Sequence, residues 1–231
     1  MKTTFHDPSF CEQAKQNKKN KLQILSKNLI LTLAILVSGI ATAQGQFEQG
    51  MGKAIGLWKD GKNAEASDLF ERIASAEKTS WLPNYYVATV NCFAAFQTKD
   101  KEQMNALLTK AQTALNTEMD KNPNNAEILV MQSMIYTAWM NYDPMTYGMK
   151  YSGKVMELYG KAEAIAPNNP RVVYGKAEFG IGGAKWTGAD VKVLCKEVER
   201  SIGLFANFKP ENAFSPNWGL QRAENALKNC K

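Results

Sequence analysis

The residues that most often carry catalytic chemistry are scarce in this chain. Its single histidine, His6, lies in a basic N-terminal stretch that we expect to be removed. Without a histidine, the remaining chain cannot form a Ser/His or Cys/His nucleophile pair, use imidazole as a general base, or bind a metal through imidazole. The composition therefore argues against most hydrolytic and metal-dependent enzymes.

Carboxylates are the next candidates, since a pair of them can act as general acid and base. The four that could act in this way are Glu65, Glu127, Glu163 and Glu178. Most lie among lysines at helical spacing, which is typical of a solvated helix face. We therefore predict that the protein is not an enzyme and that it needs no cofactor and no metal.

Residues 179–188, FGIGGAKWTG, have the glycines of a phosphate-binding loop. Such a loop follows a strand and leads through Gly-Lys-Ser/Thr into a helix. Here the segment before the glycines is predicted to be helical, and no Gly-Lys-Ser/Thr follows them. We interpret the stretch as a glycine-terminated helix followed by a turn into a helix capped by Thr187, with Asp190 at the capping-box position.

Methionines and aromatic residues are concentrated in one region. They are Met131, Met134, Met140, Met145, Met149, Met156, Trp139, Tyr142, Tyr147 and Tyr151. Thioethers adapt to varied partners and suit binding grooves. Because most of these positions follow helical spacing, we favour the interpretation that they fill the core and the spaces between helices. Self-association through this region is a further interpretation.

Three cysteines follow the N-terminal stretch, and their spacing fits no metal motif. Cys195 lies near the start of one predicted helix and Cys230 at the end of the next. If these helices are antiparallel neighbours, the two residues meet. We hypothesise that they form a disulfide, which an oxidising compartment permits, and that Cys92 is a buried apolar residue.

Residues 1–43 have the organisation of a secretory signal peptide. A basic region precedes residues 29–41, which are 13 residues without charge, whereas a spanning helix needs about 20. Ala41, Thr42 and Ala43 then supply a small-x-small cleavage site. We expect cleavage before Gln44 and export to the periplasm or the exterior; an uncleaved anchor is the alternative. After cleavage there would be no integral membrane span.

The formal net charge of +6 raises the question of a nucleic-acid partner. Residues 1–43 carry a net +4, so the remaining chain is near +2. No later segment has the clustered basic stripe that a phosphate backbone requires. We expect no nucleic-acid partner.

The positions that would carry any site lie on helices, because apolar residues recur at helical spacing along residues 44–231 and no run alternates like a strand. Prolines and glycines divide the pattern into about nine helices. We predict them at 46–60, 63–78, 82–97, 100–121, 125–141, 144–165, 169–182, 188–206 and 217–229. The last is expected to begin at Pro216.

Three similar turns separate these helices, at Pro123, Pro167 and Pro210, with spacings of 44 and 43 residues. In each, proline ends one helix and a nearby asparagine can cap the next. The pentapeptide YGKAE also occurs twice, at Tyr159 and Tyr174. These copies are only 15 residues apart, so we interpret them as one packing solution, a tyrosine beside an alanine, used on both sides of one turn.

The N-terminal part of this pattern resembles the tetratricopeptide repeat. The residues that carry the resemblance are Ala54, Leu57, Gly61, Ala66, Phe70 and Ile73. The small position where two helices of a hairpin touch continues at Ala88, Ser133 and Ala177, at intervals of 34, 45 and 44 residues. The resemblance implies an all-α stack of antiparallel helical hairpins, a TPR-like solenoid, as one domain over residues 44–231.

The resemblance also implies a concave groove lined by the first helix of each hairpin. By the family's helix phase, the groove residues would be Met51, Ile55, Tyr85, Thr89, Val130, Met134, Tyr174 and Glu178. Aromatic and thioether side chains with one acid suit an apolar peptide that carries a basic group.

The leading hypothesis is an exported, non-catalytic scaffold that binds a protein or peptide partner in this groove. The alternative is a cell-envelope enzyme or small-ligand carrier with a pocket between hairpins.

Overall fold

The structure is a computed structural model in which residues 44–230 are described. The sequence-based expectations for His6 and the signal peptide lie outside these residues. The described chain divides into a short N-terminal stretch that ends at Gln49 and is helical, and a compact unit that begins at Gly50. The two are considered separately, and the remainder of the description concerns the second unit.

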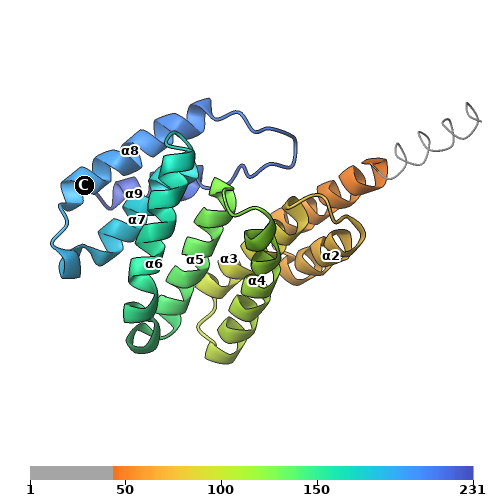
Figure 1. Cartoon of the computed structure of the whole chain (residues 1–231), viewed down its shortest axis with the longest axis horizontal. Coiled ribbons are helices and arrows are strands. Elements are labelled where there is room, and N and C mark those ends of the chain that lie inside the picture. Colours follow the sequence, from red (N-terminus) through yellow and green to blue (C-terminus); the bar gives the residue numbers. More distant parts are fainter. Residues whose placement is uncertain (1–43, 231) are drawn as a thin grey trace, which may run out of the picture. The chain divides into compact units, whose positions relative to one another are not determined.

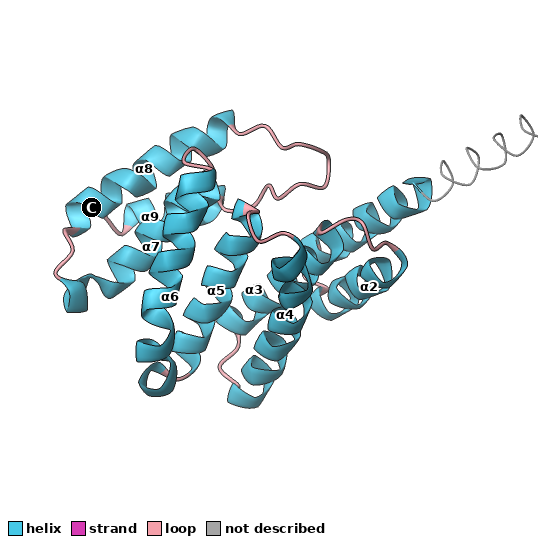
Figure 2. Ribbon diagram, viewed as in Figure 1, coloured by secondary structure: helices cyan, strands magenta, loops and turns pink. Residues whose placement is uncertain are grey.

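All regular structure in residues 44–230 is helical (Figure 2). Helix 50–59 opens the compact unit. It is followed by α2 (Asn63–Ala76), α3 (Leu82–Gln97), α4 (Lys101–Lys121), α5 (Ala126–Tyr142), α6 (Pro144–Ile165), α7 (Pro170–Thr187), α8 (Val191–Asn207) and α9 (Leu220–Lys228). The all-α prediction, with about nine helices, is confirmed.

The helices pack as successive antiparallel hairpins (Figure 1). Contacts are most extensive within α3–α4, α5–α6 and α7–α8, while α3 also packs on α5, and α5 on α7. The first helices of the hairpins therefore form an inner layer. Eleven of the 16 residues of α3 and 11 of the 17 of α5 are buried, against three of the 22 of α6. A helix that is apolar on all sides is expected in such a central position.

Small residues allow the helices to approach one another. The four predicted contact positions, Ala54, Ala88, Ser133 and Ala177, are all buried. The tyrosine–alanine pairs of the two YGKAE copies are buried as well, which confirms the packing predicted for them. Where Tyr159 of α6 meets α7, a Cβ on Gly175 would lie 2.6 Å from the hydroxyl oxygen of Tyr159.

Side-chain caps fix where several helices begin. Asn125 accepts hydrogen bonds from the backbone N–H groups of Glu127 and Ile128, and Asn169 accepts from those of Arg171 and Val172. Both caps satisfy N–H groups that have no partner within the helix. The prediction that asparagine caps the helix after Pro123 and Pro167 is confirmed.

Two predicted boundaries are wrong. Helix α7 continues through both glycines of the glycine-rich stretch to Thr187, and it ends where Gly188 adopts φ 71°. Asp190, not Thr187, caps α8. A helix with an intact hydrogen-bond ladder tolerates Gly at about 1 kcal/mol per residue, so Gly182 and Gly183 did not end α7.

The C-terminal turn also differs from the prediction. No helix begins at Pro216: residues 208–219 form a long connection, and α9 starts at Leu220, after Gly219 adopts φ 117°. The turn at Pro210 is therefore not equivalent to those at Pro123 and Pro167. We call residues 208–230 the C-terminal segment.

Candidate functional site

The C-terminal segment covers the side of α3 and α7 on which the groove was predicted. The indole N–H of Trp218 donates to the Tyr85 hydroxyl at 2.9 Å, and its ring meets that of Phe93 edge-on with centroids 5.2 Å apart. The Tyr86 hydroxyl donates to the backbone carbonyl of Phe214 at 2.8 Å. Side chains of the chain itself thus occupy the place of an incoming peptide.

Helix α9 extends this cover over α7 and α8. Ala223 packs in one cluster with Tyr174 and Ala177 of α7 and Val198 of α8. Arg222 donates to the carboxylate of Glu178 at 3.2 Å, and its guanidinium lies 5.3 Å from the Phe93 ring centre. Arg222 thus places a basic group of the chain itself beside Glu178, where we predicted the basic group of a bound peptide.

An arginine buried beneath the C-terminal segment links it to two hairpins. Arg171 of α7 is 1% exposed, and its Nε and Nη2 donate to both carboxylate oxygens of Glu127 on α5, at 2.6–2.9 Å. The guanidinium also lies 4.5 Å from the Phe208 ring centre and donates to the Trp218 carbonyl at 3.4 Å. Burial alone would lower the pKa of Arg171, but the hydrogen bonds and charge of Glu127 outweigh it and raise that pKa, so Arg171 stays charged.

These contacts determine how exposed the eight predicted groove residues are. Six are buried: Met51, Tyr85, Thr89, Val130, Met134 and Tyr174. Ile55 and Glu178 are partly exposed, and Glu178 is paired with Arg222. An open groove lined by all eight side chains is therefore absent from the described residues, because the inner helices pack against their neighbours and the C-terminal segment. Partner binding at these positions remains a prediction.

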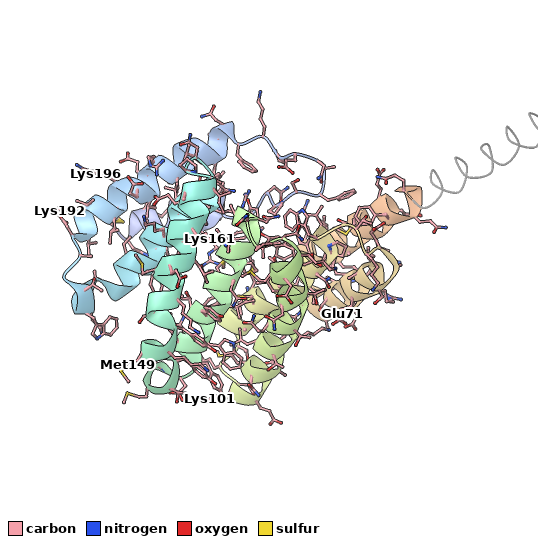
Figure 3. All side chains as sticks on the ribbon, in the orientation of Figure 1. Glu71, Lys101, Met149, Lys161, Lys192 and Lys196 are labelled. Atoms are coloured by element: carbon pink, nitrogen blue, oxygen red, sulfur yellow. A yellow bond between two sulfur atoms is a disulfide. The ribbon has the colours of Figure 1, made fainter. Side chains whose placement is uncertain are left out.

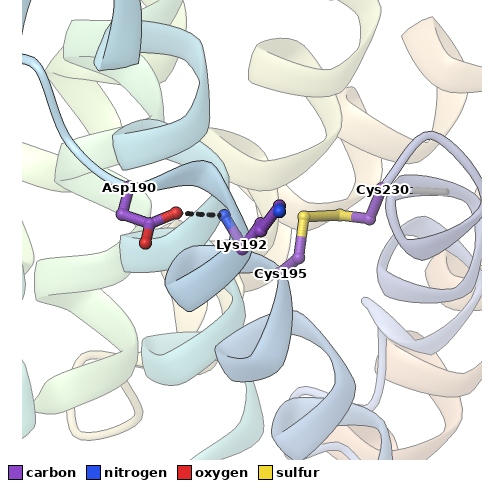
Figure 4. Close-up of a disulfide and its surroundings, with 4 residues drawn as sticks. All are labelled: Asp190, Lys192, Cys195 and Cys230. Carbon is purple, nitrogen blue, oxygen red and sulfur yellow. Dashed lines mark hydrogen bonds between the residues drawn. A yellow bond between two sulfur atoms is a disulfide. The ribbon is translucent and has the colours of Figure 1, made fainter.

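The C-terminal segment is tied covalently to α8. Cys195 and Cys230 form a disulfide with their Cα atoms 5.9 Å apart (Figure 4). Helices α8 and α9 are neighbours in the fold, as the disulfide hypothesis required. Cys92 is a free and buried thiol on α3, and burial raises its pKa to about 12.

A pocket of about 640 Å³ opens beside this cover, at the end of the molecule where α4 leads into α5 and α6 into α7. Its walls are those two turns and residues 208–216. Trp81 and Phe208 contribute aromatic surface, Lys121 and Lys209 contribute charge, and Glu127 connects it to the buried Arg171 pair. We call it the loop-end pocket.

A different surface lies at the opposite end of the α5–α6 hairpin. The rings of Tyr136 and Tyr151 stack at 4.2 Å with an interplanar angle of 5°, and Tyr147 stacks on Tyr151 at 5.5 Å and 2°. The ammonium of Lys150 lies over both Tyr147 and Tyr151. We call this the hairpin-tip surface; it comprises Lys101, Tyr136, Trp139, Tyr142, Met145, Tyr147, Met149, Lys150, Tyr151 and Lys154.

Methionines behave differently on the two helices of this hairpin. Met131 and Met134 of α5 are buried, as predicted for core filling. Met145 and Met149 of α6 are 88% and 93% exposed, so the core-filling prediction is wrong for them. Helical spacing alone did not distinguish the two, because α6 is an outer helix with few buried positions.

Three of the four candidate carboxylates have structural partners. Glu127 pairs with Arg171, Glu163 with Lys176, and Glu178 with Arg222. Within residues 44–230, no group of three or more His, Cys, Asp or Glu side chains is arranged to hold a metal ion. In the same part of the chain, no helix combines the length and apolarity needed to cross a membrane.

Comparisons with known proteins agree with the fold. No protein-family profile and no curated protein sequence matches this chain. Among solved structures it is similar to the HusA haemophore from Porphyromonas gingivalis, with a TM-score of 0.71 and 22% identity over 80% of this chain and 92% of that one. A thermophilic TPR protein from Thermus thermophilus, TTC0263, is 13% identical over 80% of this chain and 98% of that one, with a TM-score of only 0.38. The first likeness supports the TPR-like helical fold.

Proposed function

We propose that the protein is an exported, non-catalytic carrier of a small planar ligand with acid groups, of the tetrapyrrole class, held in the loop-end pocket. The observation that carries the proposal is the pocket itself. Its volume of about 640 Å³ falls within the range of roughly 300–1,000 Å³ that is usual for small-ligand sites.

The lining of the pocket suits such a ligand. Trp81 and Phe208 offer aromatic surface against which a flat ring system can pack. Lys121 and Lys209 can pair with carboxylates at the rim. The similar HusA is named a haemophore, which directs the proposal to tetrapyrroles among planar acids.

The cover over the inner helices favours a small ligand over a peptide. A peptide in the predicted groove would have to displace Trp218 and Arg222 from Tyr85 and Glu178. The loop-end pocket requires no such displacement, because it lies at the edge of the C-terminal segment. The signal-peptide pattern and the Cys195–Cys230 disulfide support export.

Residues 44–231 contain no histidine, and the residues lining the pocket include no methionine, cysteine or tyrosine. We therefore expect ring stacking and acid pairing, not axial ligation of iron, to supply most of the affinity. Haem and metal-free protoporphyrin should then bind with similar dissociation constants.

Absorbance titration with haem and with metal-free protoporphyrin tests the proposal. Trp81→Ala should weaken the binding of both compounds by about tenfold. Loss of an aromatic contact costs roughly 0.5–1.5 kcal/mol in addition to the contribution of the buried area. Trp186→Ala is the matched control, because Trp186 is 74% exposed and does not line the pocket. No binding of either compound at about 100 μM, far above typical carrier affinities, or equal effects of the two variants, would refute it.

A further inference from the structure

We propose that the hairpin-tip surface attaches the protein peripherally to an anionic lipid surface. This inference concerns the end of the α5–α6 hairpin and does not depend on what the loop-end pocket binds.

Apolar side chains at this end are presented to solvent to an unusual degree. Met145 and Met149, in the first two turns of α6, are 88% and 93% exposed. Long flexible thioethers can enter the acyl boundary of a bilayer without a preformed pocket on the protein. Met131 and Met134, on the partner helix, are buried, and Met156, further along α6, is 46% exposed, so the exposure of the methionines is greatest at the tip.

The rings behind the methionines have the composition of a membrane-interface belt. Trp139 lies 5.2 Å from Tyr147, and Tyr142 meets Trp139 edge-on at 5.6 Å. Tyrosine and tryptophan favour the interface because each combines an apolar ring with a polar group that stays at headgroup level. Stacking among Tyr136, Tyr147 and Tyr151 holds the rings in place.

Lysines surround these rings. Lys101 lies over the Tyr142 ring at 5.6 Å, Lys150 over Tyr151 at 5.1 Å, and Lys154 over Tyr151 at 6.0 Å. Lysines attract an anionic leaflet, and their apolar stems can lie along apolar surface. Met149 and Lys101 mark this end of the molecule in Figure 3, whereas Lys192 and Lys196 lie on α8.

Two of the nearby acids are engaged in the fold. Asp143 accepts from the backbone N–H groups of Met145 and Thr146, and Asp100 accepts from those of Glu102 and Gln103. Both therefore act as helix caps. Glu102, in the first turn of α4, is a further acid at this end.

Charge favours lipid over a second copy of the chain as the occupant. A two-fold interface brings the same patch of each copy together, so the lysines around the rings would face lysines. An anionic headgroup layer offers the opposite sign at every point of contact.

The test uses vesicles of phosphatidylcholine alone and with about a quarter phosphatidylglycerol, in a sedimentation assay that contains no added ligand. The same form of the protein is used for every variant, so any contribution from residues 1–43 is common to all. Wild-type protein should bind anionic vesicles about tenfold better than neutral ones. Met145→Ser with Met149→Ser, and separately Lys150→Gln with Lys154→Gln, should each reduce binding by roughly fivefold. Lys192→Gln with Lys196→Gln is the matched charge control and should bind as wild type.

A local probe makes the outcome independent of the rest of the chain. An environment-sensitive fluorophore attached through Met149→Cys should shift to the blue on anionic vesicles, and the same label at Lys196→Cys should not. Equal binding by the methionine double variant and wild type would overturn the proposal. So would a dimer, detected by light scattering without lipid, that the methionine substitutions dissolve, because the occupant would then be a second copy.

Discussion

The molecule contains two groups of aromatic rings with cations beside them, and they have opposite surroundings. In the first, Tyr85 and Phe93 of α3 pack against Trp218 of the C-terminal segment, with Arg222 over Phe93. In the second, Tyr136, Tyr147 and Tyr151 stack at the hairpin tip, with Lys150 over two of the rings. The first group is closed by a segment more than 100 residues away in sequence, and the second has no comparable cover among the described residues.

The cations differ in a way that fits these surroundings. Arg171 and Arg222 each reach a carboxylate of the inner helices. A planar guanidinium can donate to both oxygens of a carboxylate while stacking on a ring, so it suits a buried site. The lysines at the tip are compact charges on flexible stems, which stay hydrated at a surface. The comparison indicates that the covered group maintains the fold, whereas the rings of the open group are partly exposed.

The largest effect should come from breaking the buried ion pair of the covered group. Arg171→Ala leaves Glu127 charged and buried, so we expect the free energy of unfolding to fall by about 3–5 kcal/mol. Urea unfolding followed by circular dichroism measures it. Arg200→Ala is the matched control: Arg200 pairs with Glu197 at the surface, and its loss should cost about 0.5 kcal/mol. A loss below about 1 kcal/mol for Arg171→Ala would contradict a supporting role for the pair.

Removing the covalent tie of the covered group should have the next largest effect. Cys195 and Cys230 are 35 residues apart, so replacing both by Ser should lower the free energy of unfolding by roughly 3–4 kcal/mol through the greater entropy of the unfolded chain. Helix α9 has only nine residues and cannot persist alone, so it should also open locally.

The reactivity of the Cys92 thiol measures this local opening of α9. Cys92 is buried beside the inner face, with a pKa that burial raises to about 12, so its thiol should react slowly with a disulfide reagent in the wild type. Faster labelling of Cys92 in the double-Ser variant under native conditions is expected. Unchanged labelling together with unchanged amide exchange in α9 would show that noncovalent contacts alone hold the cover.

The smallest effect should follow truncation in the open group. Tyr147→Ala removes stacking on Tyr151 and contact with Trp139, but the ring is partly in solvent. We expect the free energy of unfolding to fall by about 1 kcal/mol, measured by the same urea assay. A loss as large as that for Arg171→Ala would mean that the tip is a structural core, and the contrast between the two groups would fail.

Local patterns were sufficient to predict the helices and much of their packing. Asn125 and Asn169 cap their helices as expected, since a cap depends on residues two or three positions away. Ala54, Ala88, Ser133 and Ala177 were placed correctly at helix contacts, because hairpin packing repeats along the chain.

The candidate sites required more than spacing. Tyr85 and Thr89 follow the helix phase of a groove, yet both are buried. The last helix was predicted over 217–229, which includes Trp218, but Trp218 lies before α9 and contacts Tyr85 across 133 residues. Glu127 and Glu178 carried no signal that arginines 44 residues further on would pair with them. The 44-residue spacing of the repeat is the one cue that could have suggested both pairs.

The sequence by itself determined an all-helical chain of hairpins, because periodicity, caps and small contact residues act within a few turns of helix. Only the tertiary structure decided that the inner helices are covered and that the loop-end pocket exists. It also decided that Met149 is exposed while Met131 is buried. These outcomes depend on which distant segment lies against a given helix. Helical periodicity reports that a side chain shares a face with its neighbours, but not what that face meets.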